Sequence, residues 1–157
     1  MAAAGELWFY HLERARLETV LADLLEKTLQ RGWRALVHAS APERLEALNT
    51  HLWTYRDDAF LPHGLAGEPH APEQPVLLTM ADANLNRADV LILTEPAPAP
   101  LTGARIGLFA RTILIFDGHD EDALAAARAQ WKAAKGEGIE VSYWQQKPEG
   151  GWAKAGT

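Results

Sequence analysis

Three continuous apolar runs constrain the fold of this chain more than any other feature of its sequence. They occupy residues 75–80, 89–94 and 111–116, and none alternates between apolar and polar positions. Such runs are typical of strands that are covered on both faces, as in a parallel sheet flanked by helices. Shorter apolar runs at 7–12 and 34–38 predict two further strands. The sequence therefore indicates a largely buried, mostly parallel sheet.

Helical periodicity appears between these runs. In residues 14–31, apolar side chains recur at i, i+3, i+4 and i+7, so one face of a helix is apolar. Gly32 is placed to end that helix in a left-handed conformation. A second helix is expected from the Ser40–Glu43 capping box to about His51, and a third over 121–135.

The order of these elements predicts the fold class. Strands that alternate with helices indicate an α/β protein. We expect a single Rossmann-like three-layer domain over 1–146, with a mostly parallel sheet flanked by helices and no nucleotide-binding glycine loop. Residues 53–74 are rich in proline, glycine and aromatic residues and predict an ordered loop. Residues 139–144 predict a final edge strand, and 147–157 a disordered C-terminal tail.

Composition narrows the choice of partner. The 157 residues carry 15 Lys and Arg against 21 Asp and Glu, a net charge of −6. Proteins that bind the phosphate backbone of nucleic acids usually carry a positive surplus. Six Trp residues favour protein interfaces, where Trp is enriched. There is neither a secretory signal at the start nor an apolar run of the roughly 20 residues that span a bilayer, so we expect a cytoplasmic protein without membrane contact.

Motifs for catalysis or cofactors are missing from the sequence. It contains neither G-x-G-x-x-G nor G-x-x-x-x-G-K-[ST], the loops that hold phosphates. The six His residues include no pair at i, i+4, and the absence of cysteine excludes thiolate sites. The acidic stretch 117–122 could hold a metal, but Asp120 as a helix cap explains it better. We expect no enzymatic activity, cofactor or metal.

Three stretches resemble the chi subunit family of bacterial DNA polymerase III. They are Phe9-Tyr-His, the segment 52–68 with its Phe-Leu-Pro-His-Gly-Leu-Ala-Gly-Glu run, and 86–93 followed by Arg128-Ala-Gln-Trp-Lys132. Their order and spacing follow the family over about residues 5 to 145. The 52–68 segment is the most specific of the three.

The resemblance implies a non-catalytic replication adaptor with two protein-binding faces. One face receives the acidic C-terminal tail of single-stranded DNA-binding protein, which ends in a phenylalanine carboxylate. The other binds psi, a small subunit that docks onto the clamp loader, or another clamp-loader component. A helicase-like protein could use that second surface instead, and DNA is met only indirectly.

Each face can be assigned to residues of this chain. Three cations at i, i+4 and i+7 lie beside a Trp on the helix over 121–135, where a guanidinium can bind a carboxylate and an indole can flank a phenyl ring. The tail site is predicted at Leu124, Arg128, Trp131, Lys132 and Lys135. The psi or partner site is predicted at Trp53, Phe60, Pro62, His63 and Leu65.

Two departures from the family concern the tail site. Leu124 stands where the family often has a second basic residue, for which Lys132 or Lys135 could compensate. Asp117 stands at the expected rim, where the family tends to be apolar. Two alternatives to the adaptor stay open: a nucleotide-binding or enzymatic α/β domain without standard motifs, and direct binding of single-stranded DNA through stacked Trp side chains.

Overall fold

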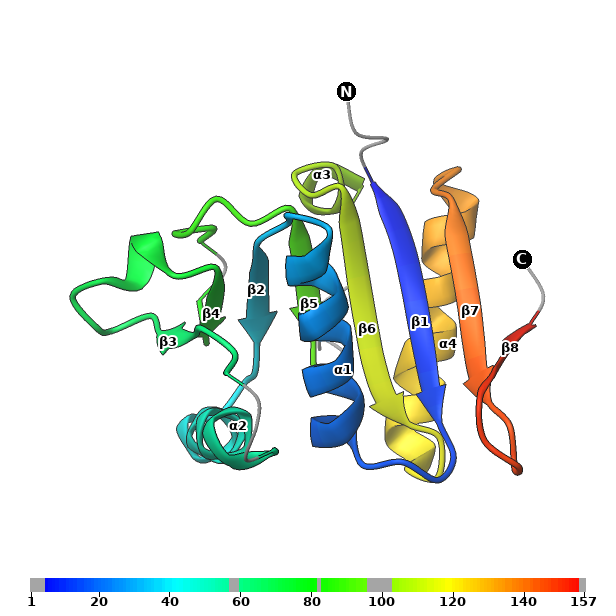
Figure 1. Ribbon diagram of the computed structural model, residues 1–157. Helices are drawn as coiled ribbons and strands as arrows, with labels where there is room; N and C mark the ends of the chain where they lie inside the picture. Colours follow the sequence, from blue (N-terminus) through cyan, green and yellow to red (C-terminus); the bar gives the residue numbers. More distant parts are fainter. Residues whose placement is uncertain (1–4, 57–59, 82, 96–102, 156–157) are drawn as a thin grey trace. The chain divides into compact units, whose positions relative to one another are not determined.

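The computed structural model describes residues 5–56, 60–81, 83–95 and 103–155. Strands and helices alternate along the chain (Figure 1). The chain divides into two compact units, which we describe separately. The first unit falls within Met1–Leu17 and Leu93–Thr157, and the second is Glu18–Ile92. In the described part of the chain, no helix has the length and apolar character needed to cross a membrane.

The first unit is built around strand β1 (Glu6–Leu12). It lies between β6 (Arg111–Asp117) and β7 (Val141–Gln146) and is parallel to both. Phe9, in the middle of β1, is opposite Leu114 on one side and Tyr143 on the other. The side chains of Phe9 and Leu114 are fully buried. The predicted strands at 7–12 and 111–116 are therefore confirmed.

Helix α4 (Glu121–Gly136) packs on β6 and β7 in the same unit, and the short helix α3 (Gly103–Ile106) precedes β6. Asp120 caps α4, because its side chain accepts hydrogen bonds from the N–H groups of Asp122 and Ala123 at 3.1 and 3.2 Å. This is the cap that the sequence predicts. Beyond α4, Gly138 adopts a φ of 77°, which reverses the chain toward β7.

The end of the chain differs from the prediction. Residues Trp152–Ala155 form strand β8, which pairs antiparallel with β7, whereas we expected 147–157 to be disordered. Gly150 and Gly151, at φ of 101° and 80°, form the turn that the Gly-Gly pair allows. Trp152 also packs edge-on against Tyr10 at 5.1 Å between ring centroids. Because β8 covers β7, the expectation that 139–144 is an edge strand is also wrong.

The second unit contains β2 (Ala35–His38), β3 (Gly64–Leu65), β4 (Val76–Thr79) and β5 (Val90–Leu93), in the order β3-β4-β2-β5. The β2–β4 and β3–β4 pairs are parallel. All residues of β4 and β5 are buried, as expected for continuous apolar runs. The α/β class with a mostly parallel sheet is confirmed.

Helices α1 (Leu17–Gln30) and α2 (Pro42–Thr54) follow β1 and β2, and a 3₁₀ turn, η1, covers Ala71–Glu73. Gly32 ends α1 at a φ of 79°, as predicted. The capping box at the start of α2 is wrong. The N-cap of α2 is Ala41, whose side chain makes no capping hydrogen bond, and Pro42 begins the helix.

The stretch at 86–93 has a structural role in the second unit. Asn86 is fully buried, and its side-chain amide donates to the carbonyl oxygens of Ala35 and Gln74 at 3.0 and 2.9 Å. Asp89 accepts from the N–H of Arg34 at 2.9 Å. Both side chains satisfy backbone groups at the start of β2, which would otherwise be buried without partners.

Candidate functional site

One side of α4 carries all five residues predicted for the tail site. We call them the α4 stripe: Leu124, Arg128, Trp131, Lys132 and Lys135. The inward face of the helix is formed by Ala127, Gln130 and Ala134, which are buried. The helical spacing predicts Leu124 and Trp131 on that face as well, but they are half-buried at its border, and the three cations are exposed. The stripe thus joins a partly buried apolar edge to a cationic one.

The cations of the stripe differ in their surroundings. Within the described residues, neither Arg128 nor Lys132 forms an ion pair. The Nζ of Lys135 lies 5.0 Å from the ring centroid of Trp131, in a cation–π contact. Lys135 is also the basic residue in the last turn of α4, where the helix dipole favours a cation. Arg128 lies too far from that end for the dipole to explain its presence.

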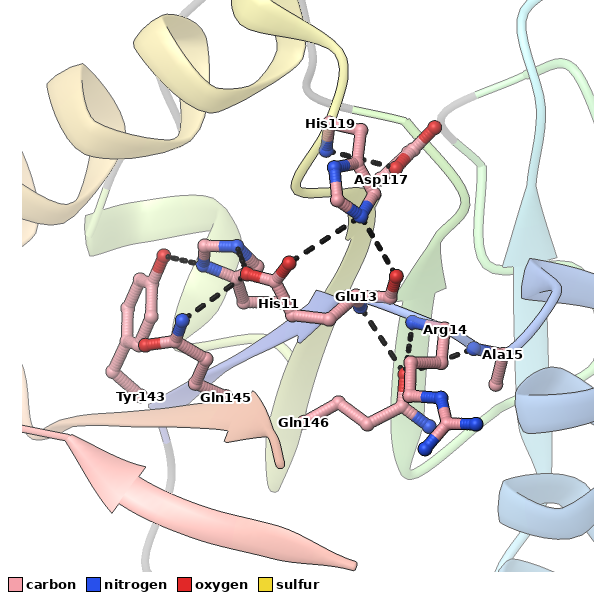
Figure 2. A network of polar contacts seen from close by, with 9 residues as sticks. All are labelled: His11, Glu13, Arg14, Ala15, Asp117, His119, Tyr143, Gln145 and Gln146. Carbon is pink, nitrogen blue, oxygen red and sulfur yellow. Dashed lines mark hydrogen bonds and ion pairs between the residues drawn. The ribbon is translucent and has the colours of Figure 1, made fainter. Parts of the chain in front are cut away.

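Strand β1 ends in a polar network that also includes residues of β7 and of the loop before α4 (Figure 2). The Nδ1 of His11 is 2.7 Å from the hydroxyl of Tyr143, and its Nε2 is 2.8 Å from Oε1 of Glu13. Gln145 donates to the same Glu13 oxygen at 3.1 Å. The Nε2 of His119 lies 2.7 Å from the carbonyl oxygen of Glu13 and 3.4 Å from its carboxylate. Glu13 is therefore the centre of the network.

Burial sets the protonation of the two groups at the core of this network. Desolvation lowers the pKa of His11 below its usual value, with Glu13 opposing and the charge of Arg128 adding to the effect. Desolvation also raises the pKa of Tyr143, while Arg128 opposes this rise. Arg128 thus acts electrostatically on both groups. At neutral pH, His11 is a neutral imidazole and Tyr143 a neutral phenol.

Close packing fixes the position of His11. A Cβ atom on Gly118 would lie 2.0 Å from Nε2 of His11 and 2.8 Å from the carbonyl oxygen of Leu12. No side chain larger than hydrogen fits there without displacing the imidazole or the backbone. The ring of Phe116 on the neighbouring strand β6 also lies 5.1 Å from the ring of His11.

The loop between β1 and α1 is where nucleotide-binding relatives of this fold class hold phosphate. Here the Oε1 of Gln146 accepts hydrogen bonds from three consecutive N–H groups, those of Glu13, Arg14 and Ala15, at 3.1, 2.7 and 2.9 Å (Figure 2). Consecutive N–H groups that converge on one point form an anion-binding nest. Because a side chain of the chain itself fills this nest, the loop offers no free N–H groups of these residues to a phosphate.

The acidic stretch before α4 has structural partners. Asp117 accepts from the N–H of His119 at 2.9 Å, and Asp120 caps the helix. Among the residues that the structure describes, no group of three or more His, Asp or Glu side chains could hold a metal ion.

The second unit carries the residues predicted for the partner site. We call Trp53, Phe60 and His63 the aromatic face. Trp53 is 53% exposed and Phe60 75% exposed, whereas His63 is buried. The ring centroid of Trp53 lies 4.4 Å from that of His63 and 6.1 Å from that of Phe60. The Nδ1 of His63 forms a 2.7 Å hydrogen bond with the carbonyl oxygen of Leu61, which fixes the orientation of the imidazole ring.

Pro62 and Leu65, the other two residues of this prediction, are half-buried. Leu65 lines an apolar groove of about 340 Å³, together with Pro42 and Leu45 of α2 and Met80 beyond β4. Pro42 and Trp53 are eleven positions apart, about three helical turns, so they lie on the same side of α2. The aromatic face and the groove therefore lie along one side of that helix.

Sequence comparison identifies the family. A family model described as "DNA polymerase III chi subunit, HolC" matches residues 5–142. The chain belongs to the DNA polymerase III chi subunit family. The match includes the α4 stripe and the aromatic face of this chi-family chain, and strand β8 lies beyond it.

Two bacterial relatives agree with this assignment. A protein of Rickettsia prowazekii (strain Madrid E) named "Probable DNA polymerase III subunit chi" is 30% identical over 111 residues, which cover 69% of the chi-family chain and 67% of the relative. The "DNA polymerase III subunit chi" of Pseudomonas aeruginosa is 38% identical over 85 residues, 54% of this chain and 58% of the relative. The chain thus matches about two thirds of the first relative and less of the second.

Solved structures share the fold at low sequence identity. The C-terminal domain of the DEAD-box protein Dbp5 matches with a TM-score of 0.56 at 16% identity, covering 92% of the chi-family chain and 91% of that domain. The flagellar accessory protein FlaH from Methanocaldococcus jannaschii matches with a TM-score of 0.50 at 10% identity, covering 92% of this chain and 72% of that one. These likenesses confirm the Rossmann-like α/β class and extend no further.

The network around His11 was missed by the sequence analysis. The sequence marks His11 only as part of the Phe9-Tyr-His motif and Tyr143 only as a residue of the predicted strand 139–144, and it assigns no role to Gln146. A polar side chain inside an apolar strand, such as His11, is the one signal that the sequence offered. Tyr143, its partner on β7, lies 132 positions away, so no spacing rule could have found this contact.

Proposed function

We propose that this chi-family protein is a non-catalytic adaptor that links the clamp loader of DNA polymerase III to the acidic C-terminal tail of single-stranded DNA-binding protein. The observation that carries this proposal is Arg128. Its side chain is exposed, has no ion pair among the described residues and lies one turn from a half-buried indole, Trp131. A free guanidinium beside an apolar edge suits a tail that ends in a phenylalanine carboxylate.

The magnitudes favour a weak and exchangeable contact. Burying a phenylalanine side chain contributes about 1.5–3 kcal/mol, and a charged hydrogen bond contributes a similar amount, about 1.5–3 kcal/mol. Ordering a flexible tail and losing rigid-body freedom offset much of this gain. The net charge of −6 also opposes the approach of an acidic peptide. Local cations on α4 are therefore needed for the tail to bind at all.

Peptide binding tests this assignment. An acidic peptide that ends in phenylalanine, measured by calorimetry or fluorescence anisotropy, should bind the wild-type protein and lose most of its affinity when the last residue is removed. Arg128→Ala should weaken binding about tenfold or more, the worth of a charged hydrogen bond. Arg31→Ala is a matched control, since Arg31 is an exposed Arg at the end of another helix. Equal affinity for Arg128→Ala and wild type would refute the site.

The aromatic face supports the second half of the proposal, binding to psi or to another clamp-loader component. Large aromatic side chains that remain over half exposed, as Trp53 and Phe60 do, are typical of interface hot spots. The apolar groove beside them could take a further apolar side chain of the same partner. A helicase-like protein is an alternative occupant of this surface.

Co-purification tests this second face. Trp53→Ala should reduce recovery of psi or clamp-loader subunits and leave tail-peptide affinity unchanged. Trp33→Ala, at a half-buried indole that stacks with Arg31, is a control for the loss of a Trp. Loss of tail binding in Trp53→Ala would show that the two faces have been confused.

A further inference from the structure

The α4 stripe contains a single guanidinium, that of Arg128, while the proposed ligand has several carboxylates. Arg128 is the first cation of α4, since Leu124 occupies the position one turn earlier. A tail that ends in a carboxylate and also carries acidic side chains has more acceptor atoms than one guanidinium can satisfy. A second donor near Arg128 would complete the site, and the network at the end of β1 contains one.

His11 and Tyr143 lie on the side of the sheet that α4 covers. Along β1, Leu7, Phe9 and His11 share one face, and Tyr143 of β7 is in contact with that face: its ring lies 5.8 Å from those of Phe9 and His11. Helix α4 packs on β7 and β6, the strands on either side of β1. Arg128 is also the α4 residue whose charge acts on both His11 and Tyr143.

The polar contacts of the two ring nitrogens of His11 define which of them holds the hydrogen. The Glu13 carboxylate can only accept, so the Nε2 of His11 that faces it at 2.8 Å carries a hydrogen. In the neutral imidazole, Nδ1 is then an acceptor, and the hydroxyl of Tyr143 at 2.7 Å donates to it. The hydroxyl hydrogen of Tyr143 is therefore occupied within the protein as long as His11 is neutral.

Protonation of His11 reverses the direction of this hydrogen bond. With a hydrogen on both ring nitrogens, Nδ1 donates to the oxygen of Tyr143, and the hydroxyl hydrogen is released to point to another acceptor. We propose that the Tyr143 hydroxyl is a second binding group for the terminal carboxylate of the tail, and that the protonation state of His11 decides whether it donates to the imidazole or to the ligand. This inference rests on the proposed tail-binding function and deepens it.

The charged groups around His11 set the direction of the pH dependence. Glu13 faces it from the loop after β1, and the charges of His119, in the loop before α4, and Arg128, on α4, also act on it. Burial, with Arg128 and His119, keeps the pKa of His11 below 6.5, so the ring is neutral at pH 7.5 and its protonated fraction rises as the pH is lowered from 7.5 to 5.5. The carboxylates of the tail, with ordinary pKa values near 3.5–4, stay ionised over this range.

The expected result is tighter tail binding at lower pH. Between pH 7.5 and 5.5 the wild-type affinity for the phenylalanine-ending peptide should rise about fivefold to tenfold, in the range of common site–site couplings. Tyr143→Phe, which keeps the ring contacts and removes only the hydroxyl, should lower affinity at pH 5.5 and leave a weaker pH dependence. His11→Gln should remove that dependence. His70→Gln is a matched control at an exposed His, and His119→Gln separates His11 from its neighbour.

The role of His11 can also be tested in the wild-type protein, so that the result does not depend on correct folding of the His11 variant. By linkage, if protonation of His11 strengthens peptide binding, the bound peptide must lower the acid dissociation constant of His11 by the same factor. Its pKa must therefore rise. A pH titration of the imidazole protons by NMR, with and without saturating peptide, reads this directly. A peptide with an amidated C-terminus should bind weakly and leave the pKa of His11 unchanged.

The outcomes separate the two proposals. A pH profile that is unaltered in Tyr143→Phe, one that is flattened only by His119→Gln, or a His11 pKa that the peptide does not move overturns the role of Tyr143 and His11, while Arg128-dependent binding leaves the adaptor function standing. If the wild type binds no peptide at any pH, or if Arg128→Ala binds as the wild type does, the adaptor function and this inference fall together.

Discussion

The α4 stripe and the aromatic face are two exposed surfaces of different chemical character, the first cationic and the second apolar. In the stripe, exposed cations border a half-buried indole, and Arg128 has no carboxylate partner within the described residues. In the aromatic face, the exposed Trp53 packs against the buried His63 and lies beside the exposed Phe60, and the adjoining groove is mainly apolar. The first surface suits a charged, flexible ligand, and the second suits an apolar, ordered one.

One small acidic protein could hold two partners independently if the two surfaces respond to different forces. Charge interactions act over about 10 Å at ordinary salt and depend on ionic strength, whereas apolar burial depends on shape and area. A substitution that changes charge on α4 should therefore change tail binding alone. A substitution that changes packing around Trp53 should change partner binding at the aromatic face alone.

The largest effect is expected from charge reversal at the stripe. Arg128→Glu places a carboxylate where the tail brings carboxylates, and like-charge contacts at interfaces cost several kcal/mol. Tail-peptide affinity should fall at least about a hundredfold, since every 1.4 kcal/mol is a factor of ten. Recovery of a psi or clamp-loader partner, measured by co-purification, should not change. Parallel loss of both partners would show that the two surfaces are coupled.

Removing the support of the aromatic face should have the next largest effect. His63→Ala takes away the ring beneath Trp53 and leaves the carbonyl oxygen of Leu61 without its hydrogen bond. The free energy of unfolding should fall by about 1–3 kcal/mol, as for other buried polar truncations. Partner recovery should fall and tail binding should persist. His70→Ala, at an exposed histidine, provides the control, and an equal destabilisation there would contradict the structural role of His63.

The elements of the fold that local pattern determines were predictable from the sequence. The continuous runs that became β4, β5 and β6 carry their own burial signal, and Asp120 is a cap because its neighbours along the chain supply the N–H groups. The failure at 147–157 has an equally physical cause. A short polar segment with two glycines is marginal alone, and Trp152–Ala155 becomes a strand only because β7 offers its edge.

The candidate sites divide in the same way. The α4 stripe follows from helical spacing, so its exposed cations could be predicted, whereas Leu124 and Trp131 lie at the border of the buried face rather than within it. The exposure of Trp53 and Phe60 and the burial of His63 depend on how one loop folds back, and residue type alone does not decide this. The contact of His11 with Tyr143 requires β1 and β7 to be neighbours in the sheet, which is a property of topology rather than of local sequence.

A change in ionic strength should affect binding at the two surfaces differently, with an effect of moderate size. Raising the salt concentration from 50 to 300 mM should weaken tail-peptide binding about threefold to fivefold, because screening shortens the reach of Arg128 and Lys132. Recovery of the partner at the aromatic face should change by less than about twofold, since apolar burial does not weaken with salt. A tail affinity that is insensitive to salt would mean that Arg128 contributes little charge to the contact.

The smallest effect should distinguish the two lysines of the stripe. Lys135 has its Nζ over the ring of Trp131 and lies at the C-terminal end of α4, so much of its charge already interacts with the protein. Lys132 is exposed, follows Arg128 by one turn and has no such ring contact within the described residues. Lys132→Ala should therefore weaken tail binding about twofold to threefold, the worth of an exposed ion pair, and Lys135→Ala by less. If Lys135→Ala has the greater effect, the carboxylates of the tail lie one turn closer to the end of the helix than Arg128 indicates, and Trp131 would then be the centre of the site rather than its flank.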